Sequence, residues 1–221
     1  MSFSKADFAD LTQIGDEALE AYAHWGAQLE KWNAHINLVA PSTVGDFWHR
    51  HAYDSWQIVN HIAAPVKTVI DLGSGAGFPG IAVAIDMKRR GAGHVTLVES
   101  AGKKANFLRS IIRELSLPAQ VINERAEAME RQTYDRVTAR AFAPLPNLLS
   151  YAHPFWGDKT RGLFLKGRGL AKEITSAQSE WEFSHKTHQS VTDEMANIVE
   201  ISELTRRVEQ TPIAKHSKAR G

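Results

Sequence analysis

One segment constrains the fold of this chain more than any other: a short run of strand-forming residues that ends in alternating glycines. Residues 66–72 are mostly apolar and rich in β-branched side chains, which is typical of a buried strand. Gly73, Gly75 and Gly77 follow at once, and a helical pattern begins at Pro79. Because doubly wound sheets bind ligands at the carboxyl ends of their strands, this segment predicts an α/β fold with a ligand site at the glycine loop.

The rest of the chain after this loop alternates between strand and helix patterns. Strand patterns occur at 94–98, 120–123, 134–139 and 162–166, and helical patterns at 79–90, 102–115, 144–152 and 170–178. Such alternation specifies a mostly parallel sheet with helices on both faces. Two consecutive strand patterns, at 181–190 and 197–204, predict an antiparallel hairpin at one edge of the sheet.

The first sixty residues read as helical instead. A 3-4-3-4 spacing of large apolar residues predicts one helix with a single buried stripe, and Asp16 is its expected N-cap. The stripe consists of Tyr22, Trp25, Leu29, Trp32 and Ile36. We expect these tryptophans in the core rather than stacked on bases. A shorter helix, or a pair, is expected over 43–62.

These patterns divide the chain into three parts. We expect residues 1–64 to form a helical extension packed on the core, and residues 65–205 to form the ligand-binding domain. Residues 206–221 contain five lysines or arginines and only one acid, so a basic, flexible tail is expected. The formal net charge of the whole chain is only +1, and any binding of nucleic acid must therefore use local patches.

Composition excludes several other classes of protein. The chain contains no cysteine, which excludes disulfides, thiolate nucleophiles and iron–sulfur clusters. No apolar run approaches 18 residues, and the first ten residues do not resemble a signal peptide, so we expect neither a membrane span nor secretion. A cytoplasmic protein is the natural interpretation. His49 and His51 are too close in sequence to share one side of a helix, and we expect no metal site there.

Three kinds of cofactor compete for the glycine loop. A dinucleotide fingerprint starting at Gly73 would have Phe78 where its last glycine belongs, and a start at Gly75 needs a strand two residues longer. A P-loop needs lysine after its last glycine, whereas Ile81 follows Gly80. An acid two residues before the first glycine, here Asp71, resembles motif I of class I S-adenosylmethionine methyltransferases. Asp71 would help to orient the methionine ammonium through backbone or water.

A second acid supports a cofactor that contains a ribose. Glu99 directly follows the predicted strand 94–98 and lies 26 residues after Gly73. An acid at the end of the second strand of such a fold accepts hydrogen bonds from both ribose hydroxyls and repels a 2′-phosphate. Glu99 is therefore a candidate ligand for the ribose of the cofactor.

Several short motifs occur in the order of one known family. They are Trp32-Asn33, Asn37-Leu38, Arg50-His51 with Asp54-Ser55, the loop 71–80 with its Phe-Pro-Gly ending, Arg140-Ala141-Phe142, and Lys166-Gly167. Over roughly residues 20–168 the chain resembles the glucose-inhibited division protein B family of bacterial small-subunit rRNA methyltransferases. The resemblance implies a Rossmann-like class I methyltransferase fold and the cofactor S-adenosyl-L-methionine. It also implies methyl transfer to N7 of a guanine in a loop of 16S rRNA, in the bacterial cytoplasm.

The same resemblance implies roles for individual residues. Gly73 matches the first glycine of motif I, and with Gly75 is expected to contact the cofactor. Phe78 stands where the family usually has leucine beside the cofactor. Ala126-Glu127 match the pair beside the adenine. Arg140 matches an arginine on the cofactor and substrate side, where we favour a cofactor contact.

The chemistry and the charge pattern complete this hypothesis. Guanine N7 carries an unprotonated lone pair, so no general base is expected, and Arg140 could instead position the substrate through O6 or a phosphate. Arg136 beside the fourth strand, and Lys166 and Arg168 after the fifth, are candidate RNA contacts at the carboxyl edge of the sheet. The partner would be 16S rRNA or the small ribosomal subunit, and we expect a monomer.

Two other functions remain open at this point. A methyltransferase of another substrate would keep the same cofactor site. A ribosome-assembly factor would bind RNA and use the pocket only structurally, although the presence of Gly73, Gly75, Glu99 and Arg140 argues against it.

Overall fold

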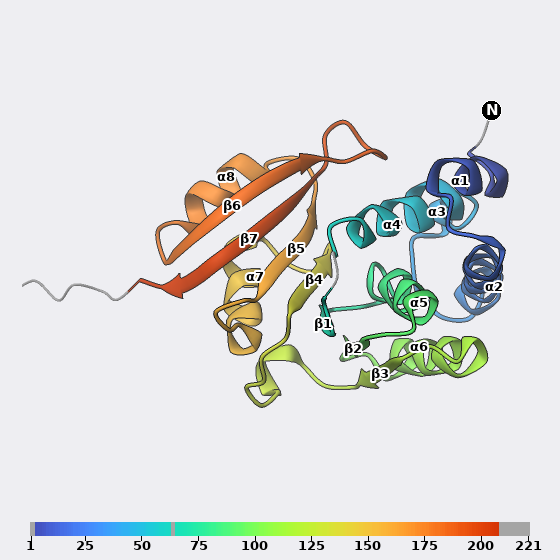
Figure 1. Ribbon diagram of the computed structural model, residues 1–221, viewed down its shortest axis with the longest axis horizontal. Helices are drawn as coiled ribbons and strands as arrows, with labels where there is room; N and C mark the ends of the chain where they lie inside the picture. Colours follow the sequence, from blue (N-terminus) through green and yellow to red (C-terminus); the bar gives the residue numbers. More distant parts are fainter. Residues whose placement is uncertain (1–2, 63–64, 208–221) are drawn as a thin grey trace, which may run out of the picture.

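The computed structural model describes residues 3–62 and 65–207, and its centre is a seven-stranded sheet (Figure 1). The strands are β1 (Thr68–Leu72), β2 (His94–Val98), β3 (Ala119–Ile122), β4 (Arg136–Arg140), β5 (Arg161–Lys166), β6 (Trp181–Gln189) and β7 (Asn197–Arg206). Their order in the sheet is β3-β2-β1-β4-β5-β7-β6. The first five strands are parallel, and β7 is antiparallel to both β5 and β6. The predicted parallel sheet with an antiparallel edge hairpin is confirmed.

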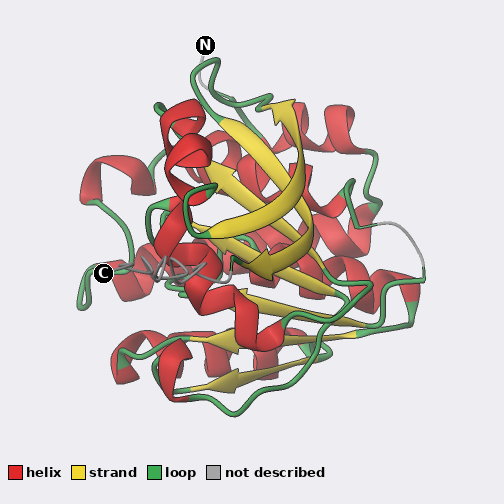
Figure 2. Ribbon diagram, turned by 90° about the vertical axis from the view of Figure 1, so that its left-hand side faces the viewer, coloured by secondary structure: helices red, strands yellow, loops and turns green. Residues whose placement is uncertain are grey.

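Helices cover both faces of this twisted sheet (Figure 2). The N-terminal part forms α1 (Lys5–Thr12), α2 (Asp16–Asn33), α3 (Pro41–Val44), the π-helix η1 (Phe47–Tyr53) and α4 (Asp54–Val59). The sheet region adds α5 (Gly80–Arg90), α6 (Gly102–Leu115), η2 (Ala126–Ala128), α7 (Leu145–Ala152), η3 (His153–Phe155) and α8 (Leu170–Ala177). In Figure 1 the N-terminal helices lie on the same side of the sheet as α5 and α6, and α7 and α8 lie on the other side.

The alternation of side chains along β1 explains how the two faces are filled. Val69 belongs to the hydrophobic cluster under α2, α5 and α6, whereas Ile70 and Leu72 belong to the cluster under α7 and α8. All three side chains are fully buried, as expected for a strand that helices cover on both faces. The apolar run in the sequence therefore supplies both cores at once.

The N-terminal helices share a core with the sheet and also hold the glycine loop. Tyr22, Trp25 and Leu29 on α2 are buried, which confirms this part of the predicted core stripe. Trp32 is only partly buried, and Ile36 is also partly buried and lies beyond the end of α2. The indole N–H of Trp25 donates a hydrogen bond to the backbone oxygen of Ala76, at 3.1 Å. Because this bond joins α2 to the loop after β1, the predicted extension contributes to the shape of the ligand site.

Some local predictions for this N-terminal part are wrong. Gly15, not Asp16, is the N-cap of α2; its φ of +82° is a value that glycine tolerates best. Asp16 is the first residue of the helix, where its charge still favours the helix dipole. The helix or pair of helices expected over 43–62 consists of three segments: the end of α3, the wider π-helix η1, and α4.

The predicted basic tail begins too early. Arg206 ends β7, and the side chain of Arg207 donates a hydrogen bond to the backbone oxygen of Gln178 at 2.9 Å. The remaining part of the predicted tail, 208–221, lies outside the described residues.

Within 3–62 and 65–207, no helix is long and apolar enough to cross a membrane.

Candidate functional site

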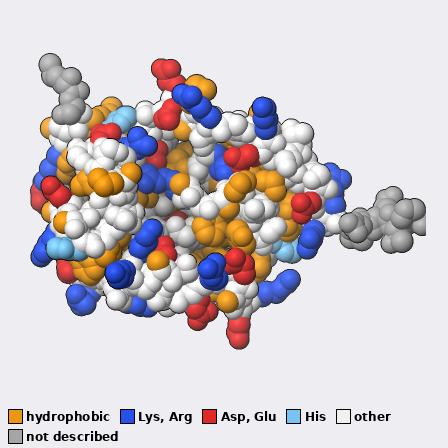
Figure 3. All heavy atoms as spheres, turned by 180° about the vertical axis from the view of Figure 1, so that it is seen from behind, with side chains coloured by type: hydrophobic (Ala, Val, Ile, Leu, Met, Phe, Trp, Pro, Cys, Tyr) orange, Lys and Arg blue, Asp and Glu red, His pale blue; other side chains and the backbone are white. Residues whose placement is uncertain are grey.

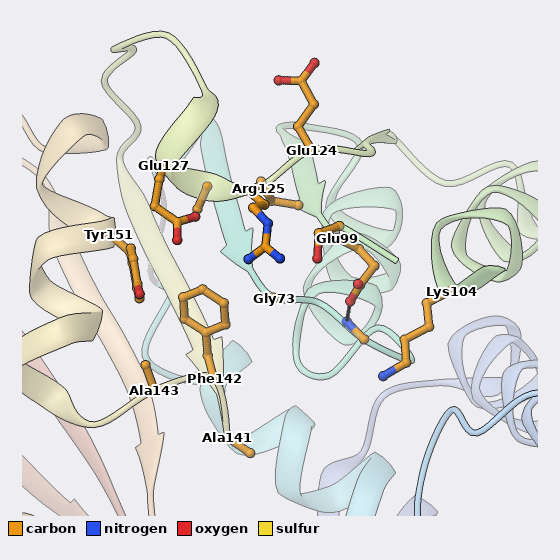
Figure 4. A pocket seen from close by; sticks show the side chains of 14 residues that line it. Gly73, Glu99, Lys104, Glu124, Arg125, Glu127, Ala141, Phe142, Ala143 and Tyr151 are labelled. Carbon is orange, nitrogen blue, oxygen red and sulfur yellow. Dashed lines mark hydrogen bonds between the residues drawn. The ribbon is translucent and has the colours of Figure 1, made fainter. Parts of the chain in front are cut away.

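A cavity of about 350 Å³ opens at the carboxyl ends of β1, β2 and β4 (Figure 4). The order of the strands reverses between β1 and β4, and such a switch point is where α/β sheets form ligand crevices. Glu99 and Lys104 line one side of the cavity, and Glu127 and Tyr151 line the other. The remaining lining residues are Gly73, Gly75, Val98, Ser100, Glu124, Arg125, Ala126, Ala141, Phe142 and Ala143.

The glycine loop can form the floor of this cavity only without side chains. Gly73 and Gly75 have φ values of +65° and +58°, in the left-handed region that other residues rarely adopt. A Cβ on Gly73 would come within 3.0 Å of the Phe142 ring, which also lines the cavity. The two glycines therefore leave the backbone of the loop open to the cavity.

Glu99 lies on the wall of the cavity with its carboxylate held in a fixed orientation. The backbone N–H of Gly75 donates to Oε2 at 2.9 Å, and the backbone N–H of Ala101 donates to Oε1 at 2.7 Å. Each carboxylate oxygen has a second lone pair that these bonds leave available. Glu99 can therefore accept two further hydrogen bonds, the number that a ribose diol would donate.

The opposite wall is apolar and aromatic. Ala126 in η2 is buried, and Glu127 beside it also lines the cavity, so the predicted pair lies together. Phe142 and Tyr151 contact each other edge to face, with their ring centroids 5.3 Å apart. The sequence alone suggested no role for these two rings, although Phe142 belongs to the Arg-Ala-Phe motif and lies two residues after the end of β4. Aromatic rings in a cavity wall can pack against an aromatic base.

Asp71 supports the loop from below and does not line the cavity. Its side chain is fully buried, and Oδ1 accepts a hydrogen bond from the hydroxyl of Thr138 at 2.7 Å. Burial raises the pKa of Asp71 to about 6, although bonds from Thr138 and Ser74 oppose this rise. The predicted contribution of Asp71 to the site is therefore confined to shaping the backbone.

Phe78 likewise lies behind the loop rather than in the cavity. Its ring is buried, packs against Trp25 at 4.8 Å between centroids, and stacks on His51 at 4.6 Å. The guanidinium of Arg140 lies 4.4 Å from the centre of the same ring. Phe78 thus joins α2, η1 and β4, so its larger ring has a structural explanation that does not involve the cofactor.

Arg140 extends toward the N-terminal helices, and the structure does not bring it to the first cavity. Its Nη1 donates to Oδ2 of Asp54 at 2.9 Å and to the backbone oxygen of Arg50 at 3.0 Å. Its Nη2 lies 3.1 Å from Nδ1 of His51. The described partners of the guanidinium come from η1 and α4, and together they form a clamp around it.

This clamp lies in a second and larger cavity of about 600 Å³. The second cavity is bounded by α3 and η1, by the carboxyl ends of β4 and β5, and by the β6–β7 loop. Ala141 lines both cavities and separates them. Its φ of +51° is unusual for a residue with a side chain.

His51 is held in its neutral form by its surroundings. Burial is the main cause, and the nearby Arg140 and Arg50 add to it, which together lower its pKa to about 3. Since Nδ1 must accept the hydrogen bond from Arg140, the ring proton is on Nε2, which donates to the hydroxyl of Thr43 at 3.2 Å. The chain of hydrogen bonds from Arg140 to Thr43 therefore has one direction.

We expect this histidine to make the protein less stable in weak acid. Because the unfolded chain takes up a proton near pH 6.5 and the folded one only near 3, His51 contributes stability above pH 6.5 that falls as the pH approaches 3. Between pH 7 and 5 the free energy of unfolding should fall by about 2 kcal/mol more in the wild type than in His51→Gln. Urea denaturation at both pH values measures this difference.

A matched variant makes that comparison specific. The side chain of His35 is exposed, so His35→Gln should follow the pH dependence of the wild type. Equal slopes for wild type and His51→Gln would contradict the assignment of a neutral, clamped imidazole.

The predicted RNA contacts are only partly at one edge. Arg136 begins β4, so it lies at the amino end of the strand and not at the carboxyl edge with Arg140; that prediction is wrong. Lys166 ends β5 and lines the second cavity, where it pairs with Glu173 at 2.6 Å. Arg168 follows it in an exposed loop. Figure 3 shows lysines and arginines interspersed with acids around a hollowed face, without one uniformly basic surface.

No cluster of metal ligands occurs in the part of the chain that the structure describes. Within 3–62 and 65–207, no three histidine, aspartate or glutamate side chains lie close enough together to hold an ion.

Over most of its length the chain is similar to proteins of one family. A family model described as "rRNA small subunit methyltransferase G" (GidB) matches residues 16–202. The chain is 41% identical to Ribosomal RNA small subunit methyltransferase G of Bartonella tribocorum over 193 residues, covering 86% of this chain and 90% of that protein. It is 42% identical to the protein of the same name from Paramagnetospirillum magneticum, covering 87% and 92%.

Similarity to solved structures supports the fold alone. The crystal structure of a SAM dependent methyltransferase from Aquifex aeolicus superposes with a TM-score of 0.55 at 11% identity. The superposition covers 80% of this chain and 97% of that one. The Rossmann-like methyltransferase fold predicted from the sequence is therefore confirmed.

Proposed function

This chain belongs to the rRNA small subunit methyltransferase G family, and we propose that it transfers a methyl group from S-adenosyl-L-methionine to N7 of a guanine in 16S rRNA. The observation that carries the proposal is the first cavity, where a clamped carboxylate faces an aromatic wall across a floor of bare backbone. The family name specifies the small-subunit rRNA, and N7 of guanine as the target atom follows from the resemblance described above.

The residues of the first cavity suit this cofactor. We propose that Glu99 accepts hydrogen bonds from the ribose hydroxyls, and that Ala126, Glu127 and Phe142 hold the adenine. Gly73 and Gly75 would allow the rest of the cofactor to lie against the loop. The volume of about 350 Å³ is within the usual range of roughly 300–1,000 Å³ for small-molecule sites.

The protein contributes alignment and exclusion of water to this reaction rather than acid–base catalysis. S-Adenosylmethionine supplies an electrophilic methyl group when it is bound, and the guanine N7 lone pair needs no deprotonation. The most perturbed carboxylate, Asp71, is buried below the loop, and the neutral His51 is engaged by Arg140 and Thr43. We therefore propose that holding N7 in line with the methyl group provides most of the rate enhancement.

The target base must leave its helix to reach such a site. The N7 edge of a paired guanine faces the deep, narrow groove of A-form RNA, which side chains do not enter. We propose that the enzyme acts on an unpaired or extruded guanine of the small-subunit rRNA, in the bacterial cytoplasm and as a monomer.

Mapping of modified nucleotides tests this function directly. Mass spectrometry of 16S rRNA from a deletion strain should show the loss of one 7-methylguanosine, and expression of the wild-type protein should restore it. Unchanged rRNA together with measurable binding of S-adenosylmethionine would favour a methyltransferase of another substrate. Absence of cofactor binding by calorimetry would favour an RNA-binding assembly factor.

Glu99→Gln tests the ribose contact. In the wild type each carboxylate oxygen of Glu99 accepts one backbone N–H, from Gly75 or from Ala101. In the variant an NH₂ group takes the place of one of these oxygens, and it cannot accept that hydrogen bond. We expect the binding of S-adenosylmethionine to weaken by about 1–3 kcal/mol. Calorimetry measures this change, and Glu182→Gln, at an exposed position on β6, is the control. An unchanged affinity would remove Glu99 from the site.

A further inference from the structure

The second cavity has the position required of an acceptor site. It meets the first cavity at Ala141, and it is enclosed by helices, strand ends and the β6–β7 loop. Its volume of about 600 Å³ also falls within the usual range of roughly 300–1,000 Å³ for small-molecule sites. A ligand in it would therefore lie next to a cofactor in the first cavity.

Arg140 retains hydrogen-bonding capacity inside this cavity. A guanidinium has five N–H groups, and the bonds to Asp54, Arg50 and His51 use three of them. Among the residues that the structure describes, the Nε–H and one Nη2–H have no partner. Because three bonds and the Phe78 ring hold the group in place, these two donors are preorganised toward a ligand.

Two carboxylates lie elsewhere on the lining of the same cavity. Asp46 precedes η1, and its side chain accepts no hydrogen bond from a described residue. Asp193 lies in the β6–β7 loop, where Oδ1 accepts the backbone N–H of Met195 at 2.8 Å and Oδ2 has no described partner. Both are exposed, so a ligand in the cavity would cover them.

The chemistry of guanine matches this set of groups. O6, an acceptor, lies beside N7, whereas the donors N1–H and N2–H₂ lie on the opposite edge of the base. A guanine that presents N7 toward Ala141 must therefore turn its N1 and N2 donors away from the cofactor. Adenine has an acceptor at N1, which a carboxylate would repel.

We propose that the second cavity binds the target guanine, with the free donors of Arg140 at O6 and the carboxylates of Asp46 and Asp193 at N1–H and N2–H₂. The inference rests on the proposed function and adds the site and the groups that select the base. Arg50, exposed on the rim of the cavity, is suitably charged for the phosphate of the same nucleotide.

Gly167 provides a way to fill this cavity without disturbing the first one. It lines the second cavity, its φ is not positive, and a Cβ added to it would meet no atom within 4 Å. Gly167→Trp should therefore fold, as circular dichroism can verify, and place an indole where the base would enter. Glu182→Trp adds the same indole at an exposed position on β6 that lines neither cavity, and it is the control.

We expect Gly167→Trp to lower turnover while leaving the binding of cofactor and the binding of RNA nearly unchanged. For Gly167→Trp, kcat/KM on small-subunit RNA should fall at least about tenfold. Its affinity for S-adenosylmethionine should stay within about twofold, and its RNA affinity within about threefold, because phosphate contacts dominate RNA binding. Glu182→Trp should retain the wild-type rate. Wild-type turnover in Gly167→Trp, or an equal loss of RNA affinity and turnover, would overturn the proposal.

The carboxylates are tested by a double substitution. Asp46→Asn combined with Asp193→Asn keeps the size of both side chains and should lower kcat/KM on RNA about tenfold or more, with cofactor affinity unchanged. Turnover within twofold of wild type would overturn the assignment of the carboxylates to guanine. Failure of the proposed function is distinguishable, because the wild-type enzyme would then produce no 7-methylguanosine in the same assay.

Discussion

Gly73→Val is expected to abolish detectable binding of S-adenosylmethionine. The branched side chain would overlap the Phe142 ring and force this ring into the first cavity. We expect this overlap to weaken cofactor binding by about 2–3 kcal/mol, or roughly 100-fold in affinity. Any direct contact between the loop and the cofactor that is lost would add to this effect. The φ of +65° adds about 1–3 kcal/mol of backbone strain, which lowers the free energy of unfolding. Calorimetry and urea denaturation measure the two effects separately.

A control variant distinguishes the site from a general effect of replacing glycine. Gly45 does not have a positive φ, and a Cβ there would meet no atom within 4 Å, so Gly45→Val should bind the cofactor normally. If Gly73→Val unfolds at the temperature of the assay, Gly73→Ala at lower temperature provides the same test with less bulk. Wild-type affinity in a folded Gly73 variant would contradict the assignment of the loop to the cofactor.

Arg140→Ala is expected to lower methyl transfer about 100-fold or more while leaving cofactor affinity nearly unchanged. The guanidinium lies in the second cavity and makes its contacts there, so its loss should affect positioning of the base and not the first cavity. Steady-state kinetics on small-subunit RNA and calorimetry with S-adenosylmethionine measure the two quantities. This expectation replaces the cofactor contact that the family resemblance favoured.

The same substitution should also weaken the fold, because it leaves the carboxylate of Asp54 without its partner. The Asp54 side chain is only 17% exposed and accepts a second hydrogen bond from Thr192, so we expect a loss of about 1–3 kcal/mol in unfolding free energy. Arg140→Lys keeps the charge but cannot make three bonds in one plane, and it should recover stability better than turnover. A large loss of cofactor affinity in either variant would contradict this expectation and indicate that Arg140 contacts the cofactor.

Asp54 also explains why the N-terminal helices belong to the site. Its two carboxylate oxygens bind different parts of the chain: Oδ2 accepts from Arg140 at the end of β4, and Oδ1 accepts from Thr192 in the β6–β7 loop. Gln57, one turn later in α4, donates to the hydroxyl of Ser190 in the same loop. The motif that joins Arg50-His51 to Asp54-Ser55 therefore links three segments that are far apart in sequence.

The part of the site formed by neighbouring residues could be predicted from the sequence. The backbone shape of Gly73 and Gly75 depends on their own φ values, and Glu99 follows directly after a strand whose apolar pattern is evident. Ala126 and Glu127 lie beside them as the family resemblance implied. The direction of Arg140 could not be predicted, because its partners Arg50, His51 and Asp54 lie 86–90 residues away.

The prediction for Arg136 failed for a related reason. Whether a residue begins or ends a strand depends on where the neighbouring strands start, and β4 pairs with β1 from Arg136 onward. The predicted strand 134–139 already had Arg136 in its first half, and the observed strand begins at this residue, so it lies at the amino edge of the sheet. Lys166, at the clear end of β5, reached the predicted edge, although Glu173 neutralises its charge there.

The sequence by itself determined the class of fold, the family and the glycine loop after β1, because hydrophobic periodicity, short motifs and glycine conformation depend on residues that are near one another in the chain. Only the tertiary structure decided that two cavities meet at Ala141, that Phe142 and Tyr151 form a wall of the first, and that Arg140 belongs to the second. The direction of a long polar side chain is set by the partners that satisfy its hydrogen bonds, and folding brings those partners from distant parts of the chain.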